Sequence, residues 1–257
     1  YGLVGSEMCI RDSRDQDPEF DLLFDSPEEG QQYVDQYKAS ILADGSTVVS
    51  ERVNFAPQPQ SSMSVIDQHT GYVKAIIGGR GEKTASLTLN RATDTTRQPG
   101  STFKILSTIA GMSEGVIDDG TYINCTGSFD LVTPPIHCWN KQGHGEIEIR
   151  EAIEQSCNYY FNMVGFKLGQ DADGNFSENR SLSVLQKYAS EIGLDKKTGI
   201  EITESAPHVS DSYAVPSYIG QGTNAYTTSQ LARYATAIAT SGNVYDLTCL
   251  LYTSDAA

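Results

Sequence analysis

The order of the secondary-structure patterns is the feature that most constrains the fold of this chain. Two β-rich runs, 64–66 and 72–77, are separated by turn residues at Thr70 and Gly71, which predicts a hairpin. Apolar side chains at helical spacing come later, over 182–192 and 231–238. Because strands precede helices without regular alternation, the pattern predicts an α+β fold rather than a doubly wound parallel sheet.

The chain divides into four parts by pattern and composition. Residues 1–13 and 249–257 match neither the pattern nor the composition of what they adjoin, and we interpret both as non-native flanks of a chain truncated on both sides. Residues 14–61 form the end of a preceding region, with a helix predicted from a capping box at Ser26 to near Asp44, and a linker rich in Pro, Gln and Ser. Residues 62–248 form the main domain.

The charge balance excludes one class of partner. The chain carries 33 acidic and 18 basic residues, a formal net charge of -15, and so lacks the basic surface that nucleic-acid binding requires. Hydrophobic residues make up 39% of the 257 residues, enough for a core. No apolar run approaches the roughly 20 residues that span a bilayer, so any membrane anchor of the parent protein is expected outside this chain.

The first candidate for chemistry is the pair Ser101 and Lys104. Pro99 and Gly100 end an extended segment and a helical pattern follows, which places Ser101 at a helix N-terminus, where free N–H groups stabilise negative charge. The three-residue spacing brings Lys104 to the same face, and its apolar neighbours favour a lowered proton affinity. Taken alone, the pair also fits a capped helix with a solvent-reaching lysine.

The second candidate pair is Ser156 and Asn158. In a non-helical connection, residues two apart point to the same side, so both could face one cleft while Cys157 turns into the core. A hydroxyl there can pass a proton to a leaving group, and an amide can hold a substrate carbonyl. An ordinary helix cap is the alternative.

A Ser-x-x-Lys element followed by a Ser-x-Asn type element is a signature of penicillin-binding proteins and class A β-lactamases. From about Ser62 to Asn243 the chain resembles the transpeptidase domain of a penicillin-binding protein, and most of all the class B, monofunctional branch. The resemblance is carried by "VIDQHTGYVKAIIGGR", "LNRATDTTRQPGSTFK", "HCWNKQGHGEIEIREAIEQSCNYYF" and "YIGQGTNAYTTSQLARYATAIATSGNV". It implies an antiparallel sheet flanked by helices with a helical subdomain, the C-terminal strands being absent.

By that resemblance Ser101 is the acylated nucleophile, Lys104 its general base, and Ser156 with Asn158 the second motif. The glycine loop, Gly220, Gln221 and Gly222, is expected to contact substrate. The implied reaction cleaves the D-Ala-D-Ala bond of peptidoglycan stem peptides and transfers the acyl group to a neighbouring amine. The implied partners are stem peptides, β-lactams as covalent inhibitors and the cell-wall synthesis machinery, at the extracytoplasmic face of the membrane.

The third motif of the family departs from the pattern. Lys197, Thr198 and Gly199 spell Lys-Thr-Gly, but Ile200 follows and the glycine loop comes later rather than earlier, so we reject this assignment. The true motif is expected beyond the end of the chain. The chain alone is therefore expected to be inactive, because the strand that completes the oxyanion hole is absent.

No metal or other cofactor is predicted. Cys125, His137, Cys138 and His144 suggest zinc only weakly, because no tight Cys-x-x-Cys pair is present. On an extracytoplasmic domain, Cys125 and Cys138 could instead form a disulfide.

Three rival functions stay open within the same resemblance. A β-lactamase would need a base for deacylation, and the stretch between Asn158 and Gly220 offers no convincing Glu-x-x-Leu-Asn context. A β-lactam sensor would be distinguished by a signalling membrane region before the domain. A non-catalytic scaffold would lack a Lys-Thr-Gly-Thr/Ser sequence further along the gene.

Overall fold

The structure is a computed structural model, and it describes residues 24, 26–43, 45–48, 51, 53, 60–80 and 88–249. The chain separates into two compact units, residues 1–59 and 60–257. The predicted flank at 1–13 and most of the flank at 249–257 lie outside the described residues, as does much of the predicted linker.

The first unit contains one described helix, α2 (Pro27–Ile41). Its N-terminus follows the sequence prediction: the Ser26 side chain accepts from the Glu29 amide at 3.1 Å, and Pro27 occupies the first turn. The helix stops at Ile41 rather than near Asp44, because Leu42 adopts an extended backbone with ψ 122°. Near its end, Lys38 forms ion pairs with Asp35 and Glu51.

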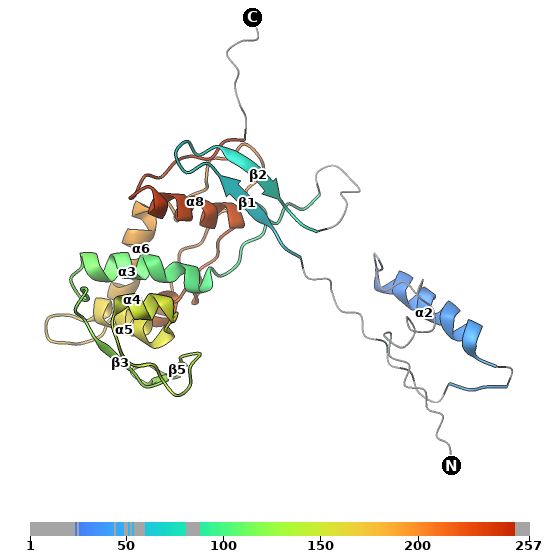
Figure 1. Ribbon diagram of the computed structural model, residues 1–257, viewed down its shortest axis with the longest axis horizontal. Helices are drawn as coiled ribbons and strands as arrows, with labels where there is room; N and C mark the ends of the chain where they lie inside the picture. The colour runs from blue at the N-terminus through green and yellow to red at the C-terminus, as the bar shows by residue number, and fades with distance from the viewer. Residues whose placement is uncertain are drawn as a thin grey trace, which may run out of the picture. The chain divides into compact units, whose positions relative to one another are not determined.

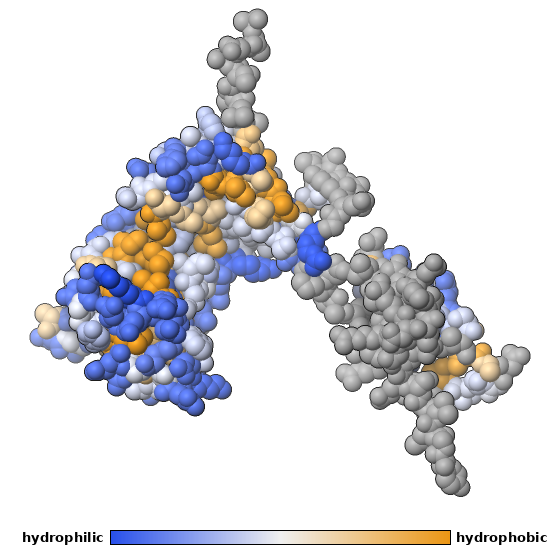
Figure 2. Space-filling view, viewed as in Figure 1, coloured by the Kyte–Doolittle hydropathy of each residue, from blue (hydrophilic) through white to orange (hydrophobic). Residues whose placement is uncertain are grey.

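The second unit begins with the predicted hairpin. Strands β1 (Met63–Ile66) and β2 (Val73–Ile77) pair antiparallel, with Met63 opposite Ile77. Helix α8 (Thr228–Ala239) lies against this hairpin (Figure 1), and serine and threonine hydroxyls join the two elements at 2.7 and 2.9 Å. On the face drawn in Figure 2, apolar surface lies over the hairpin, where Met63, Val65 and Ile77 are exposed.

The rest of the unit is mainly helical. A 3-10 turn, η1 (Gly100–Phe103), leads into α3 (Lys104–Ser113), and α4 (Ile149–Glu154), α5 (Asn158–Gly169), α6 (Glu178–Glu191) and α7 (Ala214–Ser217) follow. Helices α3, α4 and α5 pack on one another, and α6 packs on α3 and α5 (Figure 1). The helical periodicities predicted from sequence over 182–192 and 231–238 are confirmed by α6 and α8.

Four short strands lie between α3 and α4. β3 (Ile123–Cys125) pairs with β6 (Gly145–Ile147), and β4 (Ser128–Phe129) pairs with β5 (Ile136–His137), both antiparallel. The sequence did not predict them, because strands of two or three residues show no measurable periodicity. With helices and antiparallel strands that do not alternate regularly, the fold is α+β, as predicted.

The core of the second unit lies between α3, α5 and α6. Its fully buried side chains include Phe103, Leu106, Phe161, Val164 and Leu185. Because α3 and α5 both face this core, their N-terminal ends, which carry Lys104 and Asn158, are brought together. The hydrophobic core therefore places the two sequence motifs side by side. Among the described residues, no helix is both long and apolar enough to cross a membrane.

Candidate active site

Ser101 lies at an exposed turn directly before helix α3. It belongs to the 3-10 turn η1, and the preceding Gly100 has φ +56°, a conformation that glycine adopts without steric cost. The Ser101 side chain is exposed, whereas Phe103 and Lys104 behind it are buried. The hydroxyl is thus presented to solvent from a rigid support.

Lys104 is a buried amine surrounded by neutral acceptors. Its side chain is 2% exposed, and Nζ donates to Ser156 O at 2.7 Å, to Ser156 Oγ at 3.0 Å and to Asn158 Oδ1 at 2.7 Å. Within the described part of the chain no carboxylate pairs with it. Burial lowers the pKa of Lys104 from 10.5 to about 8, against a weaker raising effect of the nearby Cys157 and Cys138.

Ser156 connects the nucleophile to the amine. Its Oγ donates to Ser101 Oγ at 3.0 Å and accepts from Lys104 Nζ at 3.0 Å. The Ser156 backbone has φ +49°, an uncommon conformation for a residue with a side chain, and it holds the hydroxyl between the two groups. The helical spacing predicted that Ser101 and Lys104 lie on the same face; the hydrogen bonds among the described residues link them through Ser156.

The second motif is arranged as the sequence predicted. Ser156 and Asn158 both reach Lys104 Nζ, while Cys157 between them is 0% exposed. The alternative of an ordinary cap also has a physical basis, but it involves a different residue: the Cys157 sulfur caps α5 by accepting from the Tyr160 amide.

This arrangement has the parts of an activated nucleophile. An exposed hydroxyl, a bridging hydroxyl and an amine of lowered pKa form one continuous hydrogen-bonded path. When Lys104 is deprotonated, it can accept the Ser101 proton through Ser156, which leaves Ser101 Oγ able to attack a carbonyl carbon. The geometry therefore supports serine acyl transfer.

The glycine loop lies against the nucleophile segment. The Gly100 amide donates to Gly220 O at 3.1 Å, and Gln98 Nε2 donates to Gly222 O at 2.7 Å. Of the three residues predicted to contact substrate, Gly220 is buried, Gln221 is exposed and Gly222 is half-buried.

In the rejected Lys-Thr-Gly sequence, Lys197 and Gly199 are exposed and only Thr198 is buried. Thr198 is 0% exposed, and both its amide and its hydroxyl donate to the Glu204 carboxylate. The carboxylate is held in addition by Gln230. A threonine occupied in this way is not available to a substrate, which supports the rejection.

A cluster of thiols and one imidazole lies directly behind the second motif. The ligand atoms of Cys125, Cys138, His144 and Cys157 all lie within 4.8 Å of one another. His144 Nδ1 is 3.5 Å from Cys125 Sγ and 3.7 Å from Cys138 Sγ, and the sulfurs of Cys138 and Cys157 are 3.9 Å apart. All three cysteines are free thiols in this structure, so the alternative of a Cys125–Cys138 disulfide is not adopted.

These four residues have the donor chemistry of a structural zinc site. Three thiols and one imidazole form a Cys₃His set, and sulfurs around tetrahedral zinc, at about 2.3 Å from the metal, are separated by roughly 3.8 Å. The Cys138–Cys157 distance of 3.9 Å fits this value. The sequence considered His137 in place of Cys157, but His137 is exposed on β5. Cys157 was missed because it is adjacent to the others only in space.

Comparisons with known proteins identify the family of this chain. Residues 62–253 match the family described as penicillin-binding protein transpeptidase domain. The chain belongs to this family. The peptidoglycan D,D-transpeptidase MrdA of Acinetobacter baumannii is 29% identical over 115 residues, 44% of this chain and 15% of the relative. The peptidoglycan D,D-transpeptidase PbpA of Mycobacterium tuberculosis is 29% identical over 195 residues, 72% of this chain and 37% of the relative.

Solved structures show the same fold. PBP2 of Pseudomonas aeruginosa, crystallised in complex with WCK 5153, superposes with a TM-score of 0.64 at 20% identity, over 74% of this chain and 48% of that one. The transpeptidase domain described here thus has the penicillin-binding protein fold. It spans between 15% and 37% of the length of the two curated relatives named above.

Proposed function

We propose that this chain carries the catalytic serine of a peptidoglycan D,D-transpeptidase. The observation that carries the proposal is the path from exposed Ser101 through Ser156 to buried Lys104, with bonds of 3.0 Å at each step. Membership of the penicillin-binding transpeptidase family supports the same chemistry.

The proposed reaction has two steps, acylation of Ser101 and transfer of the acyl group to an amine. Ser101 Oγ attacks the carbonyl carbon of the penultimate D-alanine in a stem peptide, and its proton passes through Ser156 to Lys104. The peptide C–N bond breaks, and the proton is returned to the departing D-alanine amine. An amine of a second stem peptide then attacks the ester carbonyl carbon and loses a proton to Lys104. The new amide bond forms as the ester C–O bond breaks, and the proton passes from Lys104 through Ser156 to Ser101 Oγ.

The remaining assignments belong to the same proposal. Asn158 holds Lys104 through its Oδ1 and is available to orient a substrate amide. The parent enzyme works at the extracytoplasmic face of the membrane with the cell-wall synthesis machinery, and its transpeptidase part, residues 62–248, is most like the class B branch. β-Lactams acylate Ser101 and remain attached.

Intact-mass spectrometry with benzylpenicillin tests the proposal, using the protein expressed from its complete reading frame. A single persistent adduct on the wild type, absent from Ser101→Ala, is the expected result. An adduct that disappears within minutes would indicate a β-lactamase instead. A folded protein that forms no adduct would be a scaffold or would use another nucleophile.

A further inference from the structure

The segment 218–226 runs alongside the segment that carries the nucleophile. Arg97 and Tyr226 exchange backbone hydrogen bonds of 2.8 and 2.9 Å, and the Gln98 side chain and the Gly100 amide bind the carbonyls of Gly222 and Gly220. Further on, the buried Ser107 hydroxyl donates to Tyr218 O at 2.6 Å. The partners of Arg97, Gln98, Gly100 and Ser107 are, in that order, Tyr226, Gly222, Gly220 and Tyr218. The two segments are therefore antiparallel.

The contact is closest at Gly220, which lies against Gly100, the residue before Ser101. A Cβ atom at Gly220 would lie 2.1 Å from Gly100 O and 2.6 Å from Gly100 N. Gly220 also has φ +74°, which a residue with a side chain rarely adopts. The backbone that precedes the nucleophile therefore rests on the backbone of this loop with no side chain between them.

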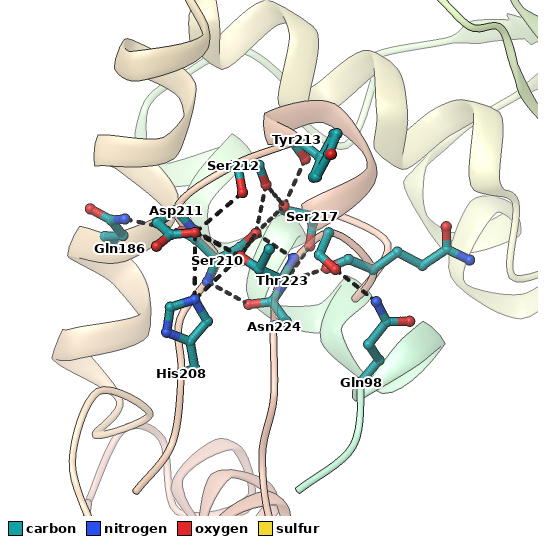
Figure 3. Close-up of polar contacts among 12 residues, drawn as sticks. Gln98, Gln186, His208, Ser210, Asp211, Ser212, Tyr213, Ser217, Thr223 and Asn224 are labelled. Atoms are coloured by element: carbon teal, nitrogen blue, oxygen red, sulfur yellow. Dashed lines mark hydrogen bonds and ion pairs between the residues drawn. The ribbon is translucent and has the colours of Figure 1, made fainter.

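A cluster of buried hydroxyls supports the loop from the other side (Figure 3). Ser217 Oγ donates to Ser210 Oγ at 2.6 Å and lies 2.8 Å from Tyr213 O, and Ser210 Oγ accepts from the Thr223 amide at 3.0 Å. Ser210 and Ser217 are both 0% exposed. A Cβ at Gly222 would lie 2.2 Å from Ser217 Oγ and 2.6 Å from Ser210 Oγ, so the hydroxyls fill the space directly beneath Gly222.

Asn224 completes this support. Its Oδ1 accepts from the Ser210 amide at 3.0 Å, and its Nδ2 donates to Ser217 O at 3.2 Å and Gln221 O at 2.9 Å. The side chain is 1% exposed. One side-chain amide thus joins the middle of the loop, at Gln221, to the backbone of both buried serines.

We infer that Ser210, Ser217 and Asn224 are positioning residues for Ser101, acting through the contacts of Gly220 and Gly222 with Gly100 and Gln98. None of the three touches Ser101, Lys104, Ser156 or Asn158 in the described hydrogen bonds. Their role is to fix the position and orientation of the turn that carries Ser101. This inference rests on the proposed function, because it concerns the acylation of Ser101.

Ser217→Ala tests the inference, with Ser181→Ala as the matched control. The Ser181 hydroxyl is also 0% exposed and also donates to a backbone carbonyl, Gly165 O at 2.8 Å. The one described bond between Ser181 and the segment 218–226, from the Tyr218 hydroxyl to Ser181 O, uses the backbone and is kept in the variant. Both variants lose a buried hydrogen bond, so both are expected to melt a few degrees lower. Only Ser217→Ala changes the support beneath the nucleophile.

The readout is the rate of acylation by a fluorescent penicillin, measured well below the melting temperatures of the variants. Varying the penicillin concentration separates the initial binding constant from the acylation rate constant. We expect Ser217→Ala to lower the rate constant by about tenfold, since misplacement by a fraction of an ångström is costly in a near-attack geometry. Initial binding and the pH midpoint of acylation should stay unchanged, because Lys104 and its partners are untouched. Gln98→Ala, which removes one exposed link to Gly222, should lower the same rate constant by less.

The outcomes are distinguishable. If the wild type forms no adduct, the proposed function fails and the inference falls with it. If the wild type is acylated and Ser217→Ala is acylated as fast, the inference alone is overturned. Equal slowing in Ser181→Ala would show a general effect of destabilisation, and a loss confined to initial binding would show that the loop contacts substrate instead; either result overturns the positioning role.

Discussion

Lys104 Nζ donates to Asn158 Oδ1 at 2.7 Å. This acceptor is the oxygen of a neutral amide, although the carboxylate of an aspartate could accept the same hydrogen bond. The hydrogen-bond partners of Lys104 are neutral, so burial is offset only weakly, by the nearby Cys157 and Cys138, and the pKa of Lys104 falls to about 8. The choice of amide over carboxylate therefore decides whether the amine can work as a base near neutral pH.

Acylation of Ser101 should accordingly increase with pH through a midpoint near 8. The reactive form has Lys104 deprotonated, so the rate constant rises as the amine loses its proton and levels off above it. The acylation rate constant measured from pH 6 to 10 checks this. A flat profile across that range would mean that Lys104 is not the base.

The free energy of unfolding should also depend on pH through Lys104. Lys104 has a lower pKa in the folded protein than its ordinary 10.5, so between about 8 and 10.5 the unfolded chain binds more protons. The free energy of unfolding should therefore contain a term that rises with pH across this window, and Lys104→Met should lack it. Urea unfolding of both proteins at several pH values measures the difference; parallel curves would contradict the buried, depressed amine.

Asn158→Asp should raise the pH midpoint of acylation. A carboxylate at this distance favours the charged amine and typically shifts a pKa by 1–3 units. The variant should acylate poorly at pH 8 and recover at higher pH. Asn179→Asp, the same change on the exposed face of α6, should leave the profile unchanged. If both variants behave like the wild type, the Lys104–Asn158 contact has no influence on the base.

Ser156→Ala should slow acylation strongly, because it interrupts the path between nucleophile and base. Positioned proton transfer typically contributes 10²–10⁴-fold, and a loss in that range is expected. Stopped-flow acylation with Ser183→Ala, an exposed serine of α6, as control provides the measurement. A loss below threefold would indicate that Ser101 passes its proton to Lys104 directly.

The thiol and imidazole cluster should bind one zinc ion per chain. Cys125, Cys138, His144 and Cys157 supply a Cys₃His set, and Cys157 lies between Ser156 and Asn158, so the metal would also stiffen the second motif. Cobalt loading should give the intense visible bands of thiolate ligation, and Cys125→Ser should weaken them. Absence of any bands in a folded protein would leave the cluster as buried thiols.

The sequence was most informative where local patterns determine structure. The hairpin, α6 and α8 follow from periodicity, and the pairs Ser101–Lys104 and Ser156–Asn158 were correctly placed near each other by the combination of motifs. The route through Ser156 was not predicted, since it depends on the positive φ of a single non-glycine residue. The fourth member of the thiol cluster and the hydroxyls in contact with Gly222 were missed for a related reason, because both contacts depend on how the chain folds back on itself, which no local sequence pattern records.

Gly220→Ala should destabilise the second unit more than positive φ alone explains. Gly115 provides the control: its φ is +69°, close to the +74° of Gly220, but a Cβ there meets nothing within 4 Å. Gly115→Ala should cost about 1–2 kcal/mol in unfolding free energy, the usual penalty of a left-handed residue with a side chain. Gly220→Ala adds a clash with Gly100 O at 2.1 Å, backbone against backbone, which neither side can relieve by rotating a side chain. Chemical denaturation of both variants should therefore show the larger loss for Gly220→Ala, together with slower acylation, because the displaced partner is the residue before Ser101. Equal losses in the two variants would mean that the loop and the nucleophile segment are not in the close contact described here.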